Sequence, residues 1–131
     1  MNLFFKYLLI FITVGIVGCT DVTNNDIQNI TPEQMLDALF EDDVQVLDVR
    51  THEEFYAGRI PGAQNICVSR GDFKEKVKEL DKNKPVYLYC KAGGRSAKAA
   101  KLLKEMGFKE IYDMSGGIEI WKDKGMKTDS L

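Results

Sequence analysis

The chain has 131 residues, of which 44% are hydrophobic, enough for one domain with a single buried core. Its 18 basic and 20 acidic side chains give a net charge of −2, and no basic stripe is interleaved with aromatic residues, which argues against nucleic-acid binding. Three cysteines and one histidine provide neither a disulfide framework nor a metal-ligand cluster, so we expect no metal.

The first 18 residues form an apolar segment with one charge, at Lys6, which is typical of a signal peptide. The segment is shorter than the about 20 residues of a membrane span, although an uncleaved anchor is the alternative. It ends in Ile16-Val17-Gly18-Cys19, which resembles the bacterial lipobox, in which the cysteine is lipidated and becomes the new N-terminus. An incidental cysteine in a signal peptide cleaved elsewhere is the other interpretation.

The lipobox resemblance implies a membrane anchor through acyl chains on Cys19, on the periplasmic side of a bacterial cell envelope. Residues 20–26 are polar and show no hydrophobic periodicity. We therefore divide the chain into a signal peptide over residues 1–18, a polar tether over 19–30 and a folded domain over 31–131.

The first half of the folded domain alternates helix and strand. Thr31-Pro32-Glu33-Gln34 predicts a helix start with a capping box, followed by apolar positions at Met35, Leu36, Leu39 and Phe40. The β-branched run 44–49 predicts a strand, residues 53–57 a short helix ended by Gly58, and residues 66–68 a short strand.

The second half repeats the alternation. We predict helices over residues 73–80, 96–106 and 118–124, and strands over 86–89 and 111–114. This pattern predicts an α/β fold with a parallel central sheet and helices on both faces. In such sheets, sites form beyond the carboxyl ends of the strands, and Cys90 lies at one of these ends.

Cys90 lies where a predicted buried strand ends and a predicted helix begins. Backbone N–H groups and the positive end of a helix dipole favour an anionic sulfur there. Lys91 and Arg95 add positive charge, the setting in which a thiol pKa falls. Gly93 and Gly94 permit the turns by which a backbone wraps around an anion. The alternative is a buried cysteine with no chemical role.

Four motifs occur in the order found in one family. Residues 90–96 (CKAGGRS) resemble the active-site loop of the rhodanese sulfurtransferases, and residues 46–50 (VLDVR) resemble the first core strand of that family. Residues 58–66 (GRIPGAQNI) are similar to its Gly-His-Ile-Pro-Gly-Ala-x-Asn-Ile signature, and residues 116–121 (GGIEIW) to its Gly-Gly-x-x-x-Trp ending. The resemblance covers about residues 31–127. It departs at Arg59, where the family usually has His, and at Cys67, where Pro is common.

The resemblance implies a rhodanese-like fold and sulfur transfer without a cofactor. Cys90 would take the outer sulfur of a small anionic donor such as thiosulfate and hold it as a persulfide, which a thiol, a thiol protein or cyanide then discharges. The loop residues Lys91, Ala92, Gly93, Gly94, Arg95 and Ser96 would bind the donor and the persulfide. We expect a monomer.

Two other functions fit the same motifs. One alternative is a sulfur carrier or protein-binding module without turnover, and the other is a phosphatase like those that share this fold. The phosphatase loop runs Cys-x5-Arg, whereas Cys90 to Arg95 is Cys-x4-Arg, and a cradle for phosphate must be wider than one for a single sulfur. The chain also lacks a convincing general acid for phosphoryl transfer.

Further predictions concern five individual residues. Asp48 and Arg50 either line the pocket or support it, with Arg50 expected to pair with Glu53 or Glu54. Cys67 is interpreted as inert, with a resolving thiol for Cys90 as the alternative. The remaining predictions are His52 as a surface or capping residue and Trp121 as a core residue.

Overall fold

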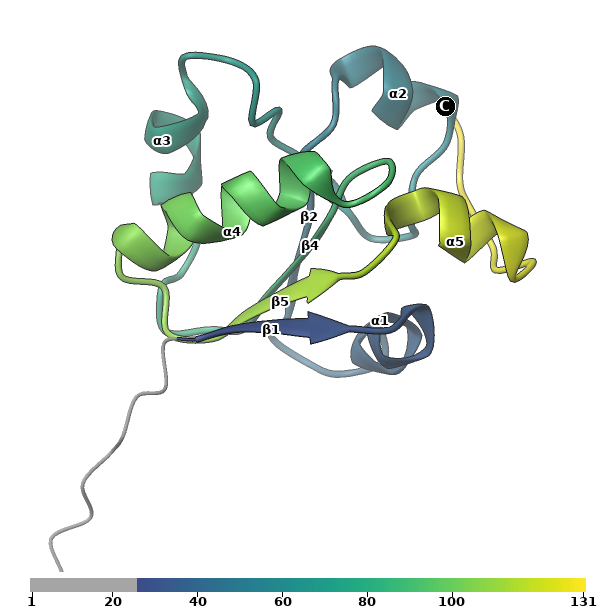
Figure 1. Cartoon of the computed structure of the whole chain (residues 1–131), viewed down its shortest axis with the longest axis horizontal. Helices are drawn as coiled ribbons and strands as arrows, with labels where there is room; N and C mark the ends of the chain where they lie inside the picture. Colours follow the sequence, from purple (N-terminus) through teal and green to yellow (C-terminus); the bar gives the residue numbers. More distant parts are fainter. Residues whose placement is uncertain (1–25) are drawn as a thin grey trace, which may run out of the picture.

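The alternation of strand and helix produces one five-stranded sheet in the computed structural model, which describes residues 26–131 (Figure 1). The strands are β1 (Ile27–Ile30), β2 (Gln45–Asp48), β3 (Gln64–Asn65), β4 (Val86–Tyr89) and β5 (Ile111–Met114). They lie in the order β1-β5-β4-β2-β3, and every neighbouring pair is parallel. The predicted fold class is confirmed.

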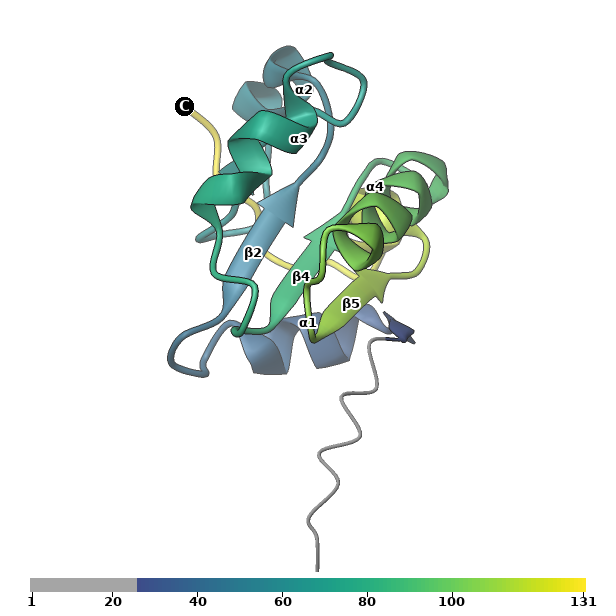
Figure 2. The ribbon, with the colours of Figure 1, turned by 90° about the vertical axis from the view of Figure 1, so that its left-hand side faces the viewer.

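Helices cover both faces of the sheet, as Figures 1 and 2 show. They are α1 (Pro32–Ala38), α2 (His52–Ala57), α3 (Phe73–Lys76), which continues into the 3-10 turn η1 (Val77–Glu79), α4 (Gly94–Glu105) and α5 (Gly117–Asp123). The helices α3 and α4 bury side chains against one face, and α1 and α5 against the other. No side chain of α2 is fully buried.

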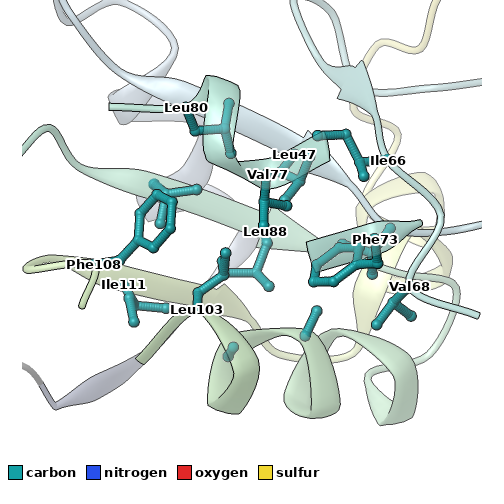
Figure 3. Close-up of a cluster of buried hydrophobic side chains, with 14 of the residues drawn as sticks. Leu47, Ile66, Val68, Phe73, Val77, Leu80, Leu88, Leu103, Phe108 and Ile111 are labelled. Atoms are coloured by element: carbon teal, nitrogen blue, oxygen red, sulfur yellow. The ribbon is translucent and has the colours of Figure 1, made fainter. Parts of the chain in front are cut away.

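Two hydrophobic clusters, one on each face of the sheet, form the core. The cluster beneath α3 and α4 joins strand residues such as Leu47 and Leu88 to Phe73, Leu103 and Phe108 (Figure 3). The cluster on the opposite face contains Met35, Tyr89 and Trp121. All four residues of β4 are buried, because this strand lies at the centre of a sheet that is covered on both sides.

Local signals set the starts of α1 and α2. The Thr31 hydroxyl accepts a bond from the Gln34 N–H, and the Gln34 side chain accepts one from the Thr31 N–H, which confirms the predicted capping box. Thr51 and Glu54 form a second box of the same kind at α2. Each box satisfies two backbone donors that a helix start leaves without a partner.

The structure corrects the predicted start of the folded domain. Residues 27–30 form β1, an edge strand that pairs with β5, so they belong to the sheet and not to the tether predicted for 19–30. Main-chain hydrogen bonds with β5 make these residues a strand. Their side chains show no apolar alternation, because Gln28 and Asn29 point to opposite faces of the sheet and both are exposed.

Three predicted elements also differ in detail. The strand expected at 66–68 is absent, and β3 ends at Asn65, because Ile66 and Val68 donate to the consecutive carbonyls of Asp48 and Val49 and so leave the regular register. The helix expected at 73–80 tightens at Val77 into the 3-10 turn. Helix α1 ends at Ala38, which leaves Phe40 84% exposed.

The predicted signal peptide and the lipidation of Cys19 lie outside the described residues and stay predictions. Within residues 26–131, no helix is both long enough and apolar enough to cross a membrane.

Two phenylalanines provide a matched test of the core. Phe108 is fully buried between α4 and the sheet, so Phe108→Ala removes packing on all sides and should lower the free energy of unfolding by about 3–5 kcal/mol. Phe40→Ala removes the same atoms from an exposed position and should change it by less than about 0.5 kcal/mol. Urea unfolding followed by circular dichroism measures both, and equal losses would contradict this assignment of the core.

Candidate active site

Cys90 lies at the carboxyl end of the central strand β4, as predicted. The thiol is 1% exposed and belongs to the same hydrophobic cluster as Leu88, two residues earlier. The chain then turns through residues 91–93 and enters α4 at Gly94. The sulfur is therefore enclosed between the sheet and the first turn of a twelve-residue helix.

The loop after Cys90 directs backbone N–H groups at the sulfur. The Gly93 N–H donates to the Cys90 Sγ over 3.0 Å, and the Ser96 hydroxyl donates to the Gly93 carbonyl over 3.1 Å. Gly93 has a φ of 121°, a conformation that side chains other than glycine rarely adopt. This glycine allows the backbone to fold around the sulfur, as expected, whereas Gly94 is the first residue of α4 and has no positive φ.

Dipoles of this loop lower the pKa of Cys90. Burial alone would raise it, but hydrogen bonds from the Ser96 hydroxyl and from the N–H groups of Ser96, Gly93 and Ala92 outweigh that effect, and the pKa lies below its ordinary value. The groups that favour the thiolate most are therefore neutral, and the Arg95 guanidinium adds a smaller attraction.

The flanking cations are both paired with carboxylates. The Arg95 guanidinium forms two hydrogen bonds with Glu54 of α2, over 2.7 and 2.8 Å. These bonds lower the pKa of Glu54 to about 2. The Lys91 ammonium lies 3.7 Å from Glu119, and both of these side chains are exposed. The Glu54–Arg95 pair thus fastens the loop to α2 and leaves little unpaired charge beside the sulfur.

Asp48 and Arg50 form a buried ion pair with each other over 2.6 Å. Arg50 also donates to the Gly58 carbonyl over 2.7 Å. The prediction that Arg50 pairs with Glu53 or Glu54 is therefore wrong, because the Asp48 carboxylate is closer and equally buried, and Glu54 is engaged by Arg95. Of the two roles considered for Asp48 and Arg50, the geometry fits support, since their side chains are 0% and 4% exposed.

The first turn of α5 braces the loop from the other side. The N–H groups of Ile118 and Glu119 donate to the carbonyls of Cys90 and Lys91 over 2.9 and 3.1 Å. This contact requires Gly117, because a Cβ there would lie 2.3 Å from the Lys91 carbonyl oxygen and 2.5 Å from that of Cys90. The glycine pair 116–117 is visible in the sequence, but its partner in space is not.

Four residues outside the loop also have defined surroundings. Cys67 is buried and free, without a disulfide among the described residues. His52 is the first residue of α2, whose cap is Thr51. The Arg59 guanidinium lies over the Phe55 ring, 4.8 Å from its centroid. Trp121 is 1% exposed and donates its indole N–H to the Lys127 carbonyl, so its core role is confirmed. No group of three metal-ligating side chains occurs within residues 26–131.

The parallel α/β domain places one buried cysteine in a loop of N–H donors that follows its central strand. The family model "Rhodanese-like domain" matches residues 31–124, so the chain belongs to the rhodanese family. The resemblance in the motifs is thereby confirmed.

Curated relatives in this family carry several names. The chain is 44% identical over 80 residues to the uncharacterized protein YqhL of Bacillus subtilis, covering 61% of this chain and 62% of YqhL. It is 40% identical over 101 residues to the tRNA uridine(34) hydroxylase of Cytophaga hutchinsonii, covering 75% of this chain but only 32% of that enzyme. It is 32% identical to the thiosulfate sulfurtransferase GlpE of Pseudoalteromonas translucida, covering 72% of this chain and 89% of GlpE.

Solved structures agree with the fold. A rhodanese-related protein of Thermoplasma volcanium matches with a TM-score of 0.70 at 30% identity, over 79% of this chain and 99% of that one. A rhodanese-like domain protein of Staphylococcus aureus matches with a TM-score of 0.67 at 33% identity and the same coverage.

The Glu54–Arg95 pair makes stability depend on pH. Because the pKa of Glu54 falls from 4.5 to about 2 on folding, the pair stabilises the fold fully above pH 4.5 and loses this effect as the pH falls toward 2. Glu54→Gln should therefore lower the free energy of unfolding at pH 7 by about 1 kcal/mol, a modest amount for a half-buried pair, and should flatten its acid dependence. Urea unfolding between pH 2 and 7 tests this prediction. Glu53→Gln, an exposed neighbour on the same turn, is the control, and identical acid profiles of the two variants would contradict it.

A second prediction concerns the brace at α5. Gly117→Ala should destabilise the fold and slow the alkylation of Cys90, since the added Cβ must displace the loop backbone. Gly107→Ala is the matched control: its φ of 92° is also positive, but a Cβ there meets open space, so it should cost only the about 1–2 kcal/mol of backbone strain. If Gly117→Ala leaves Cys90 as reactive as Gly107→Ala does, α5 does not hold the loop.

Proposed function

We propose that this protein is a sulfurtransferase that carries sulfur on Cys90. The observation that supports this function best is the loop of N–H groups around a buried thiol whose pKa is lowered. We expect the N–H groups of this loop to stabilise the persulfide anion as well, whose charge lies on the outer sulfur about 2 Å beyond Sγ.

The reaction would proceed in two displacements. The Cys90 thiolate attacks the outer sulfur of thiosulfate, the sulfur–sulfur bond of the donor breaks, and sulfite leaves with the bonding electron pair. Cys90 then holds the transferred atom as a persulfide anion. In the second step a thiolate or cyanide attacks that outer sulfur and expels the Cys90 thiolate, which regenerates the free protein. Neither step needs a cofactor.

The size of the loop favours sulfur over phosphate as the transferred group. The sulfur of Cys90 already occupies the hydrogen-bonding position of the Gly93 N–H, and Arg95 is engaged by Glu54 on both of its terminal nitrogens. A phosphate would need that guanidinium and a wider ring of donors. The named function of one relative, the thiosulfate sulfurtransferase GlpE, points the same way.

A sulfur carrier is the second candidate, and one relative supports it. The chain is 33% identical over 84 residues to the putative sulfur carrier protein YrkF of Bacillus subtilis, covering 44% of that protein. A carrier would load sulfur on Cys90 and release it only to a partner protein. Small-molecule turnover distinguishes the two functions.

The test uses the two described cysteines as a matched pair. After incubation with thiosulfate, intact-mass analysis of the wild type and of Cys67→Ser should show one added sulfur atom, whereas Cys90→Ser should show none, because a serine hydroxyl does not carry sulfane sulfur. Added cyanide should remove the sulfur with ping-pong kinetics. Stable loading without turnover would favour the carrier, and loading that survives Cys90→Ser would overturn the proposal.

A further inference from the structure

The buried side chain of Asp113 lies on strand β5, on the side of the sheet that α4 covers. Asp113 of β5 is 6% exposed, and its Oδ1 has no hydrogen-bond partner within the described residues. No ion pair among residues 26–131 includes this carboxyl group. A buried carboxylate without a cation is costly, so its position calls for an explanation.

The register of the sheet places Asp113 on the same side as Cys90. Asp113 pairs with Leu88 of β4, and Leu88 and Cys90 both belong to the cluster beneath α4. Alternate residues of a strand share one side, so Asp113 and Cys90 lie on the α4 side of neighbouring strands. Burial raises the pKa of Asp113, and the hydrogen bond from the Ser96 hydroxyl offsets only part of that rise.

The Ser96 hydroxyl connects the two groups. Ser96 is fully buried on the first turn of α4, and its hydroxyl donates to the Gly93 carbonyl over 3.1 Å. The same hydroxyl lowers the pKa of Cys90 and the pKa of Asp113. A hydroxyl has one proton to donate, so these acceptors compete for it. An ionised carboxylate is the stronger competitor, whereas a neutral carboxylic acid donates its own proton instead.

We propose that Asp113 is a positioning residue that controls the charge of Cys90 through the Ser96 hydroxyl. When Asp113 is neutral, the carboxylic acid donates to the Ser96 oxygen, and the hydroxyl proton is available to the Cys90 thiolate. When Asp113 is ionised, it takes that proton and repels the thiolate. The support of the thiolate therefore weakens as the pH rises through the ionisation of Asp113.

Within residues 26–131, burial and the Ser96 hydroxyl are the influences on the pKa of Asp113, and no charged side chain is among them. On β1, the residue in register is Asn29, and β1 contains no ionisable side chain. The side chains that α4 buries are Ser96, Ala99, Ala100 and Leu103. On β4, Tyr87 and Tyr89 belong to the cluster on the opposite face, which leaves Cys90 as the titrating partner.

The test measures alkylation of Cys90 by iodoacetamide between pH 4 and 9, by mass spectrometry of the Cys90-containing peptide of the full chain. The wild type should show two ionisations in its rate profile. Asp113→Asn keeps the shape but cannot ionise, so it should show one ionisation and react at least about threefold faster at neutral pH, where loss of a nearby like charge increases the thiolate fraction. Ser96→Ala should react more slowly than the wild type, and Asp113→Asn should have a much smaller effect in the Ser96→Ala background.

Several outcomes would overturn the inference. Superimposable profiles of Asp113→Asn and the wild type would do so, as would an equal effect of Asp113→Asn with and without Ser96. If circular dichroism shows that Asp113→Asn is unfolded, the wild-type profile still decides, because a single ionisation there contradicts a second titrating group. The inference rests on the proposed function only for the role of Cys90, and alkylation needs no sulfur transfer. A reactive, Asp113-dependent thiol that never accepts sulfur would refute the function and leave the inference standing.

Discussion

The site depends on the contact between the first turn of α5 and the backbone of Cys90 and Lys91. The N–H groups of Ile118 and Glu119 donate to these two carbonyls, which are thereby engaged by α5. Buried carbonyls need such partners, and the same loop directs the Gly93 N–H at the sulfur. The gap left by Gly117 permits this approach, so a residue far along the sequence shapes the surroundings of the thiol.

Neutral dipoles stabilise the thiolate at this site, whereas the nearby charged side chains are paired with each other. The thiolate is supported by N–H and O–H groups inside a buried loop, where salt screens little. The cations Lys91 and Arg95 lie at the rim and are bound to Glu119 and Glu54. Because the carboxylates offset most of the local charge, the site holds an anion chiefly through the fixed direction of its backbone.

The sequence predicts the parts of this arrangement that depend on near neighbours. The parallel sheet, the Thr31 capping box and the position of Cys90 behind β4 follow from periodicity and local chemistry, and the structure confirms them. The partners of Arg50 and Arg95 do not follow, because several carboxylates lie within reach along the chain and only the fold selects among them. Strand β1 does not follow either, because its four residues show no apolar alternation and only pairing with β5 makes them a strand.

The order of strands also bears on how the chain reaches its native state. The first strand, β1, pairs with the last, β5, and the central strand β4 needs β5 as a neighbour. Such long-range pairings form late, since the chain must lose the entropy of closing a large loop before the strand contacts contribute favourable free energy. Helix α5 follows β5, so the brace on the loop assembles after the sheet is complete. We therefore expect a nascent or partly folded chain to carry Cys90 as an ordinary thiol, whose pKa falls only when the last helix docks.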